Sequence, residues 1–261
     1  MTRVLLLDGL REVPPDAPVL RADDLGVVRG EAVFETMRVL DGRPCFLAEH
    51  LSRMQRSAAR LGMVLPDGFE QLAAAAAAGA EDAGLRLTLT KGGVGFAVLF
   101  DVAPETVAGR AGVSVVTLEL GIASDYRAGQ AWALGGVKST SYAVNMAALR
   151  HAHDLGADDV IWVSTDGFVL EAPTSTVVAH VDGEWVTPPA ETGILPGTTL
   201  LAVQRATEVR QRPLLVDELT ADVALLSSVR GVAPVTRLDG CALPTEQSLA
   251  LQASYEALLR S

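Results

Sequence analysis

The stretch AVFETMRVLDGRPCFL, residues 32–47, predicts the type of sheet on which the N-terminal part of the chain is built. Residues 32–40 are predicted to form a strand, along which Phe34, Thr36 and Arg38 share one face. Asp41 and Gly42 follow as a good hairpin-turn signal. Residues 47–61 then show the apolar spacing of a helix.

Further strand-like runs lie on both sides of this stretch, at residues 4–9, 85–93 and 96–102. A second, alanine-rich helix is expected near residues 69–80. Strands that alternate with few helices and are joined by turn residues favour antiparallel pairing. We therefore expect an antiparallel sheet with helices on one side.

Residues 103–111, APETVAGRA, contain proline and glycine, lack apolar periodicity, and are interpreted as a linker. This linker predicts a small N-terminal domain of residues 1–108 and a larger C-terminal domain of residues 109–261. In the second domain, strands are expected at residues 112–120, 159–172 (a pair) and 176–186, and helices at residues 142–155, 198–210 and 245–259. A further apolar segment lies at residues 222–235. The predicted fold class is α/β (α+β) with two domains.

The composition excludes several classes of function. The 261 residues are 49% hydrophobic and carry a net charge of −11, so neither a nucleic-acid nor a membrane partner is expected. Cys45 and Cys241 lie far apart without metal-ligand spacing, which predicts free thiols in a reducing compartment. Because the N-terminus also lacks the pattern of a signal peptide, we expect a cytoplasmic protein. His151 and His153 are two residues apart on an expected helix and do not face each other, so no metal site is predicted.

Lys138 is one of only two lysines in the chain. It lies in ALGGVKSTSYAV, residues 133–144, among glycines, hydroxyls and a tyrosine, with no acidic residue nearby in sequence. Burial of such an amine lowers its pKa, and only the neutral amine attacks a carbonyl carbon in Schiff-base chemistry. Taken by itself, Lys138 also fits a surface lysine at a strand end.

Three other segments have residue types that suit an ionic ligand. Glu171 leaves an apolar strand and needs a cationic partner, which a protonated ring nitrogen of a cofactor could supply. Residues 191–199, ETGILPGTT, open a helix with two glycines and the hydroxyls of Thr198 and Thr199, a suitable seat for phosphate. The guanidinium of Arg53 also suits a phosphate dianion. Each has a structural alternative as well: a surface carboxylate, a helix cap and a solvated arginine.

The order of these segments resembles the fold-type IV pyridoxal-phosphate enzymes. This family comprises branched-chain aminotransferases, D-amino acid aminotransferases and aminodeoxychorismate lyases. The resemblance covers nearly the whole chain and is carried by EHLSR (residues 49–53), Lys138 with Tyr142, DGFVLEAPTST (166–176), GILPGTT (193–199) and SSVRGVAPV (227–235). It implies a small antiparallel sheet with helices, followed by a larger β-barrel-like domain with helices.

The resemblance also implies pyridoxal 5'-phosphate as cofactor, a small-molecule amine or amino acid as substrate, and a homodimer. Lys138 would form the Schiff base with the cofactor, Glu171 would pair with its ring nitrogen, and Tyr142 would hydrogen-bond its phenolate oxygen. The residues implied to bind the phosphate are Arg53, Thr198, Thr199 and Ser228. The residues implied to contact the substrate are Phe34, Thr36, Arg38, Lys91 and Thr174.

Lyase members resemble this chain at Thr36 and Arg38 and in the SVRG stretch, residues 228–231. The sequence therefore predicts an aminodeoxychorismate lyase, which forms 4-aminobenzoate, a folate precursor, and pyruvate from 4-amino-4-deoxychorismate. The alternatives are a D-amino acid aminotransferase, a branched-chain or other aminotransferase, an enzyme with both lyase and transaminase activity, and a catalytically silent carrier of the cofactor.

The chain departs from the family pattern at three positions. Ala172 stands where the family has glycine, and Thr176 stands where it has asparagine. Lys91 replaces the arginine of a Thr-Arg-Gly motif, so a fork-shaped contact to a carboxylate would become a point charge.

Overall fold

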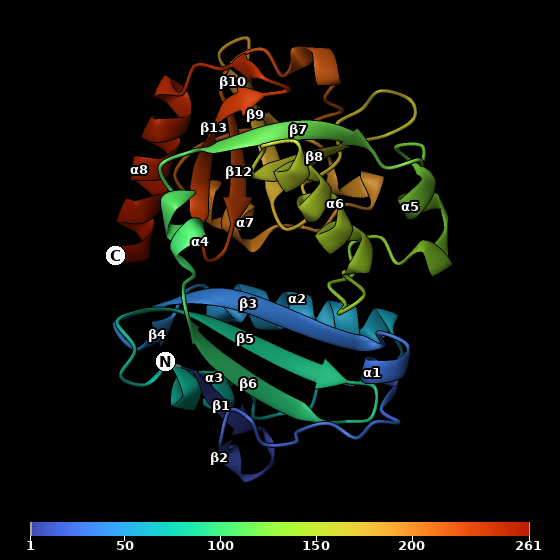
Figure 1. Cartoon of the computed structure of the whole chain (residues 1–261), viewed down its shortest axis with the longest axis vertical. Coiled ribbons are helices and arrows are strands. Elements are labelled where there is room, and N and C mark those ends of the chain that lie inside the picture. The colour runs from blue at the N-terminus through green and yellow to red at the C-terminus, as the bar shows by residue number, and fades with distance from the viewer. Residues whose placement is uncertain (1, 261) are drawn as a thin grey trace. The chain divides into compact units, whose positions relative to one another are not determined.

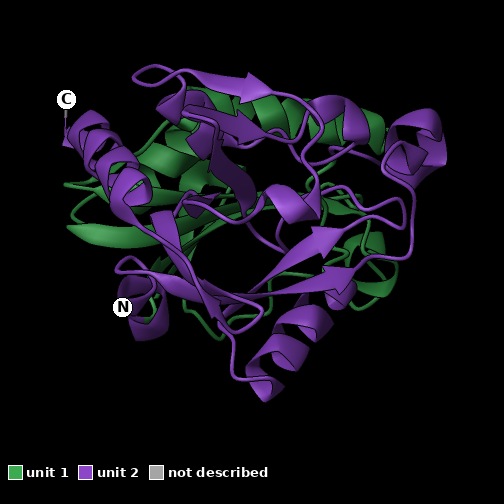
Figure 2. Ribbon diagram, turned by 90° about the horizontal axis from the view of Figure 1, so that it is seen from above, with its two compact units in different colours: residues 1–103, 137–142 green, residues 104–136, 143–261 purple. Residues whose placement is uncertain are grey.

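The computed structural model describes residues 2–260, which fall into two compact units (Figure 2). Unit 1 comprises residues 1–103 and 137–142, and unit 2 comprises residues 104–136 and 143–261. The mixed α/β class that the sequence predicts is confirmed, because each unit contains one sheet with helices.

Unit 1 is built on a six-stranded antiparallel sheet with the order β2-β1-β6-β5-β3-β4 (Figure 1). Its strands are β1 (Arg3–Leu6), β2 (Arg11–Val13), β3 (Ala32–Leu40), β4 (Arg43–Pro44), β5 (Asp82–Thr90) and β6 (Gly95–Asp101). Its helices are the 3-10 turn η1 (Asp8–Leu10) and α1 (Leu25–Val28), α2 (Leu47–Arg60) and α3 (Phe69–Ala77). The hairpin predicted at Asp41 and Gly42 is present, with φ angles of 48° and 74° that suit the twist of the strands it joins.

The alternation along β3 separates a core face from an open face. Val33 and Met37 are fully buried against α2 and α3, together with Met54 and Leu72 of those helices. Successive side chains of a strand point to opposite faces of the sheet, so Phe34 points to the face opposite to that of Val33. Helix packing on one face thus leaves the other face available for a ligand.

Residues 137–142 belong to unit 1 although they are distant from it in sequence. The backbone N–H of Phe34 donates to the carbonyl of Lys138 (3.2 Å), and that of Thr140 donates to the carbonyl of Ala32 (2.9 Å). These bonds hold the segment alongside β3 and explain its grouping with unit 1. The units therefore differ from the predicted domains, residues 1–108 and 109–261, and the domain boundary itself stays a prediction.

Unit 2 contains an eight-stranded mixed sheet with the order β11-β10-β9-β12-β13-β7-β8, in which β14 pairs with β13. Its strands are β7 (Val113–Glu119), β8 (Asp159–Val163), β9 (Thr176–Val181), β10 (Glu184–Thr187), β11 (Val209–Gln211), β12 (Val223–Ser227), β13 (Gly231–Leu238) and β14 (Cys241–Ala242). Its helices are α4 (Pro104–Ala108), α5 (Tyr126–Gly129), α6 (Ala143–Asp154), α7 (Thr198–Val203) and α8 (Glu246–Arg260), with 3-10 turns η2 (Ala131–Ala133), η3 (Ala190–Thr192) and η4 (Val216–Glu218). Buried aliphatic side chains of the sheet form its core, among them Ile161, Leu214 and Leu225.

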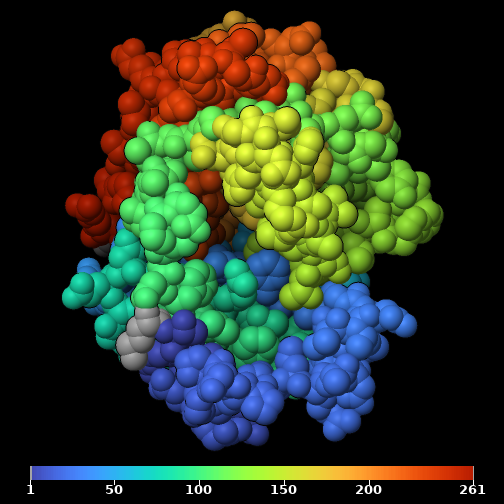
Figure 3. Space-filling view, in the orientation of Figure 1, coloured from blue at the N-terminus to red at the C-terminus, as the bar shows by residue number. Residues whose placement is uncertain are grey.

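Helix α6, drawn yellow-green on the face shown in Figure 3, packs its small residues Ala148 and Ala152 against β8. Its residues His151 and His153 are exposed to solvent. Within residues 2–260, no group of three or more His, Cys, Asp or Glu side chains is arranged to hold a metal ion. No helix in the same part of the chain is both long and apolar enough to cross a membrane.

Candidate active site

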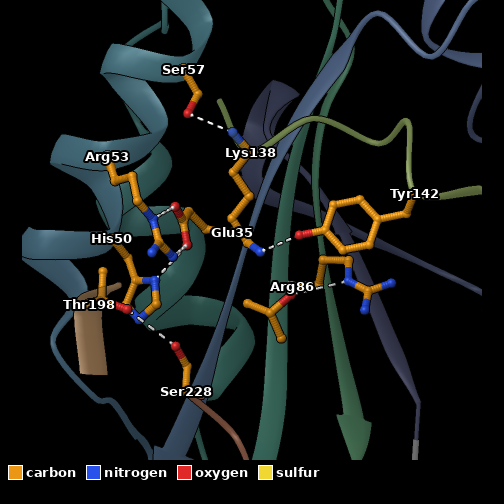
Figure 4. Close-up of polar contacts among 10 residues, drawn as sticks. Glu35, His50, Arg53, Ser57, Arg86, Lys138, Tyr142, Thr198 and Ser228 are labelled. Atoms are coloured by element: carbon orange, nitrogen blue, oxygen red, sulfur yellow. Dashed lines mark hydrogen bonds and ion pairs between the residues drawn. The ribbon is translucent and has the colours of Figure 1, made fainter. Parts of the chain in front are cut away.

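Lys138 is fixed at its backbone and directed by its neighbours. Its N–H donates to the hydroxyl of Ser57 on α2 (3.1 Å), and its Nζ lies 3.1 Å from the hydroxyl of Tyr142 (Figure 4). The ammonium group also lies 4.4 Å from the ring centroid of Phe34, which packs edge-to-face on Tyr142 at 5.2 Å. The structure therefore brings together, within unit 1, three of the residues that the sequence predicts for the site.

Arg53 belongs to a buried ionic cluster on the core side of β3 (Figure 4). Its Nε and Nη2 donate to the two oxygens of Glu35, each at 2.7 Å, and Nδ1 of His50 lies 2.6 Å from the same carboxylate. Burial raises the pKa of Glu35, but the charge and hydrogen bonds of Arg53 and His50 outweigh it and lower that pKa to about 2. Burial lowers the pKa of His50, so we assign an ion pair between Glu35 and Arg53 beside a neutral imidazole.

The sequence motifs predict a role for Arg53 but none for Glu35. The signal was available, because Glu35 occupies a core-facing position of β3 between Val33 and Met37, where an acid requires a cation. His50, three residues before Arg53, lies on the same face of α2 and reaches the same carboxylate.

The other residues predicted to contact the substrate have different surroundings. Arg38 makes a two-pronged ion pair with Asp82, at 2.8 and 2.7 Å. The ammonium of Lys91 donates to the carbonyls of Leu61 and Gly62. Two further predicted residues belong to different units. Thr36, on β3 of unit 1, accepts a hydrogen bond from Arg86 at 3.3 Å, and Thr174, in unit 2, is exposed in the loop before β9.

Glu171 lies in unit 2, and both of its carboxylate oxygens accept hydrogen bonds. Arg127 on α5 donates from Nη1 at 2.9 Å, and the backbone N–H of Leu195 donates at 3.0 Å. The cationic partner that the sequence required is thus supplied by the protein, 44 residues before Glu171. Arg127 could not be predicted from the sequence, because no motif connects it with Glu171.

The predicted phosphate-binding hydroxyls of unit 2 gather at the start of α7. Thr198 and Thr199 are both buried, and the hydroxyl of Thr198 lies 3.2 Å from that of Ser228, at the end of β12 (Figure 4). Gly197 precedes them, and a Cβ at this position would lie 2.3 Å from the hydroxyl oxygen of Thr176. The hydroxyl groups and Gly197 therefore pack too closely for a side chain at position 197.

These two sets of residues fit pyridoxal phosphate. The amine of Lys138, beside the phenol of Tyr142, can form a Schiff base with an aldehyde. The guanidinium of Arg53, oriented by Glu35, can form an ion pair with a phosphate. Clustered hydroxyls can donate to phosphate oxygens, and an ionised carboxylate held by Arg127 can pair with a protonated ring nitrogen. Unit 1 therefore offers an amine and a guanidinium, and unit 2 offers hydroxyls and a carboxylate, whose chemistry suits the aldehyde, phosphate and ring nitrogen of pyridoxal phosphate.

Comparison with known proteins agrees with this set. A sequence model of the family described as amino-transferase class IV matches residues 32–238. A bifunctional aminodeoxychorismate lyase / D-amino acid transaminase from Mycobacterium tuberculosis is 40% identical, with 92% of this chain and 93% of that protein aligned. A D-alanine aminotransferase from Bacillus licheniformis is 28% identical, with 84% of this chain and 82% of that protein aligned.

Solved structures give the same result. The α-ketoglutarate and PMP bound form of a hypothetical aminotransferase from Mycobacterium tuberculosis superposes with a TM-score of 0.93 at 36% identity, with 98% of each chain covered. A fold IV transaminase from Curtobacterium pusillum superposes with a TM-score of 0.91 at 36% identity over 100% of each chain. The chain belongs to the class IV aminotransferase family and is a pyridoxal-phosphate enzyme.

Proposed function

We propose that this enzyme is an aminodeoxychorismate lyase that also transaminates D-amino acids, with pyridoxal phosphate attached to Lys138. The observation that carries the proposal is the amine of Lys138, held 3.1 Å from the hydroxyl of Tyr142 by a segment bonded to β3. The 40% identity to a bifunctional lyase and transaminase over 93% of its length supports the choice of reactions. We also retain, as predictions, a cytoplasmic homodimer and a role in making a folate precursor.

Lys138 has two roles in this proposal. Its amine would hold the cofactor, and the same amine, when free, would accept the proton from the substrate carbon that bears nitrogen. Tyr142 donates or accepts one hydrogen bond at Nζ, which limits the positions that the flexible side chain can occupy. The backbone N–H of Lys138 donates a hydrogen bond to Ser57 of α2, which holds the Lys138 backbone in place.

Arg53 and the hydroxyls at the start of α7 would hold the cofactor phosphate. Glu35 keeps Arg53 oriented through two of its nitrogens, which lowers the entropy lost when the guanidinium binds phosphate. Thr198 and Ser228 would donate hydroxyl hydrogens to the phosphate oxygens.

Glu171 would pair with the protonated ring nitrogen, and when bound the cofactor serves as a sink for the electrons left after proton removal. Its two oxygens are held by Arg127 and by the N–H of Leu195, so the carboxylate has a set orientation before any ligand binds. The two reactions would differ after proton removal: aminodeoxychorismate would lose pyruvate, whereas a D-amino acid would give up its amino group.

The attachment site can be tested by reduction of the purified holoprotein with borohydride, followed by peptide mapping. We expect the label on Lys138 and on no other residue, together with loss of the visible absorbance band in Lys138→Ala. The matched control is Lys91→Ala, because Lys91 is the other lysine of the chain and its removal should leave the band in place. A label on Lys91, or no label, contradicts the proposal.

The reactions can be separated with two substrates. Aminodeoxychorismate alone should yield 4-aminobenzoate and pyruvate without a keto-acid acceptor, whereas D-alanine should be consumed only when 2-oxoglutarate is present. A lyase without transaminase activity would show the first result alone, and a D-amino acid transaminase would show the second alone. Turnover of L-valine in place of both would favour a branched-chain aminotransferase and overturn the choice of substrate.

A further inference from the structure

The loop that carries Ser228 is held by side chains from other parts of unit 2. Residues 228–230 join strand β12 to strand β13, which pair with each other on both sides of the loop. The carbonyl of Val229 accepts a hydrogen bond from Nη2 of Arg110 at 3.1 Å. The next residue, Arg230, makes the other contacts that fix the loop.

The side chain of Arg230 is directed into the interior of unit 2. Its Nη2 donates to the carboxylate of Asp159, at the start of β8, at 2.8 Å. The same nitrogen donates to the hydroxyl of Ser175, in the loop before β9, at 3.1 Å. The side chain of Arg230 is 13% exposed and that of Asp159 is 2% exposed. Each charge therefore depends on the other, because an unpaired charge is costly in the interior of a protein.

Ser175 belongs to the turn that follows Glu171. The N–H of Ala172 donates to the carbonyl of Ser175 at 2.9 Å. The N–H of Trp162 on β8 donates to the carbonyl of Glu171, also at 2.9 Å, and Asp159 lies on the same strand. Strand β8 therefore supports the residue that is proposed to meet the ring nitrogen and, through the buried ion pair, the loop whose hydroxyl is proposed to meet the phosphate.

Packing alone does not account for an arginine at position 230. Its Nε is buried and has no hydrogen-bond partner within residues 2–260. A buried N–H without a partner and a buried ion pair both cost free energy that an apolar side chain of similar size avoids. What Arg230 provides and an apolar side chain would not is a directed connection between two loops of the site.

We propose that Arg230, paired with Asp159, positions Ser228 for the phosphate of pyridoxal phosphate. The hydroxyl of Ser228 lies 3.2 Å from that of Thr198 (Figure 4), and the ion pair would keep the two hydroxyls together. The guanidinium is already bound to the protein, so Arg230 would act through Ser228 and not by contact with the cofactor. This inference rests on the proposed function, because it concerns the phosphate that these hydroxyls would bind.

The test compares pyridoxal phosphate with pyridoxal, which has the same ring and aldehyde but lacks the phosphate. Each is titrated into the purified full-length protein freed of cofactor, and absorbance gives the two dissociation constants. In Arg230→Met we expect the affinity for pyridoxal phosphate to fall about 10-fold and that for pyridoxal to change less than about 3-fold. Arg230→Lys should recover part of the loss, because it keeps a charge beside Asp159. Arg237→Met, an exposed arginine on β13, is the control and should leave both affinities unchanged.

A second variant separates positioning from stability. Arg230→Met leaves the carboxylate of Asp159 without its cation, which lowers the stability of the chain. Asp159→Asn combined with Arg230→Met removes both charges, so its unfolding midpoint in urea should lie closer to that of wild type. The preference for pyridoxal phosphate over pyridoxal should nevertheless stay reduced about 10-fold. A double variant that regains the wild-type preference together with stability shows that the ion pair serves stability alone and overturns the proposal.

A double-mutant cycle tests whether Arg230 acts through Ser228. Ser228→Ala alone should weaken the binding of pyridoxal phosphate and leave that of pyridoxal nearly unchanged. Arg230→Met added to Ser228→Ala should cause a further loss of less than about 3-fold, because the two residues act on the same contact. Fully additive losses, or equal weakening of both ligands in Arg230→Met, overturn the inference. Ser228→Ala with a wild-type preference contradicts the placement of the phosphate in the proposed function, and the role of Arg230 is then rejected with it.

Discussion

Glu171 illustrates how one residue can be prepared for its role by two donors of different kinds. Arg127 donates a charged hydrogen bond to one carboxylate oxygen, and the backbone N–H of Leu195 donates a neutral hydrogen bond to the other. Glu171→Gln should keep the cofactor bound but slow proton removal from D-alanine roughly 100-fold, because a neutral amide does not stabilise a protonated ring nitrogen. Stopped-flow absorbance of the half-reaction measures this rate, and an unchanged rate would mean that another group supports the ring nitrogen.

Arg127 should have a smaller effect than Glu171, since it acts through the carboxylate. Arg127→Gln removes the positive charge beside one oxygen of Glu171 and leaves the hydrogen bond from the N–H of Leu195 to the other. We therefore expect the half-reaction to be roughly 10-fold slower and the cofactor absorbance to shift in wavelength. Arg150→Gln, an exposed arginine on α6, is the matched control. Equal rates in Arg127→Gln and Arg150→Gln would reduce the Arg127 contact to a structural one.

The roles of residues that lie in short sequence motifs were the easiest to predict. Lys138, Glu171 and Thr198 each lie in a segment whose neighbours suggest their chemistry, and their roles remain predictions that the geometry supports. Arg127 and Glu35 could not be assigned in the same way, because their partners come from other elements of the fold. Glu35 still had a detectable signal, an acid at a core-facing strand position.

At the scale of the element, the start of α7 depends on a residue without a side chain. A Cβ on Gly197 would lie 2.3 Å from the hydroxyl oxygen of Thr176, so one of the two segments would have to move. Gly197→Ala should lower the free energy of unfolding by about 1–3 kcal/mol and weaken cofactor binding, since the shift affects Thr198. Urea unfolding and titration with pyridoxal phosphate measure the two effects.

The same contact predicts a rescue. Adding Thr176→Ala removes the hydroxyl that the new methyl group would meet, so the double variant should be more stable than Gly197→Ala alone. Gly129→Ala serves as control, because a Cβ at position 129 would meet no heavy atom within 4 Å outside its chain neighbours and its own helix backbone. A loss in Gly129→Ala as large as that in Gly197→Ala would argue against a steric cause.

The predicted ends of helices and strands agree with the structure where a local sequence signal marks them. They differ where the end depends on pairing with a strand distant in sequence. The Asp41 and Gly42 hairpin was predicted, because the turn chemistry is local. The helix expected at residues 198–210 is wrong in its length: α7 ends at Val203. Residues 209–211 form β11 instead, parallel to β10, since Trp185 pairs with Val209. Apolar spacing within one segment does not reveal a partner strand more than twenty residues away.

At the scale of the whole molecule, the division into two units could not be predicted from the order of segments along the chain. A Pro- and Gly-containing segment was expected to separate the domains, yet residues 137–142 return to unit 1 by bonding to β3. This return places Lys138 on unit 1, although the surrounding chain on both sides belongs to unit 2. Such a crossing depends on hydrogen bonds between segments about a hundred residues apart, which no local pattern encodes.

Stability toward acid is a property of the whole chain that the buried cluster of Glu35, His50 and Arg53 should influence. The pKa of His50 is lowered from 6.5, so folding excludes a proton that the unfolded chain binds, and stability should fall as the pH drops below about 6.5. The pKa of Glu35 is lowered from 4.5 to about 2, so its contribution is present above pH 4.5 and is lost as the pH falls toward 2.

The second of these windows can be measured with Glu35→Gln. In wild-type protein the lowered pKa of Glu35 corresponds to a contribution on the order of 3 kcal/mol that disappears between about pH 4.5 and 2. Glu35→Gln should be less stable than wild type at pH 7, because Arg53 then faces a neutral amide, and its unfolding midpoint in urea should change less with pH across this window. Asp67→Asn removes an exposed acid of unit 1 and should keep the wild-type slope. If Glu35→Gln shows the same slope as both, the acid sensitivity arises from carboxylates elsewhere in the chain.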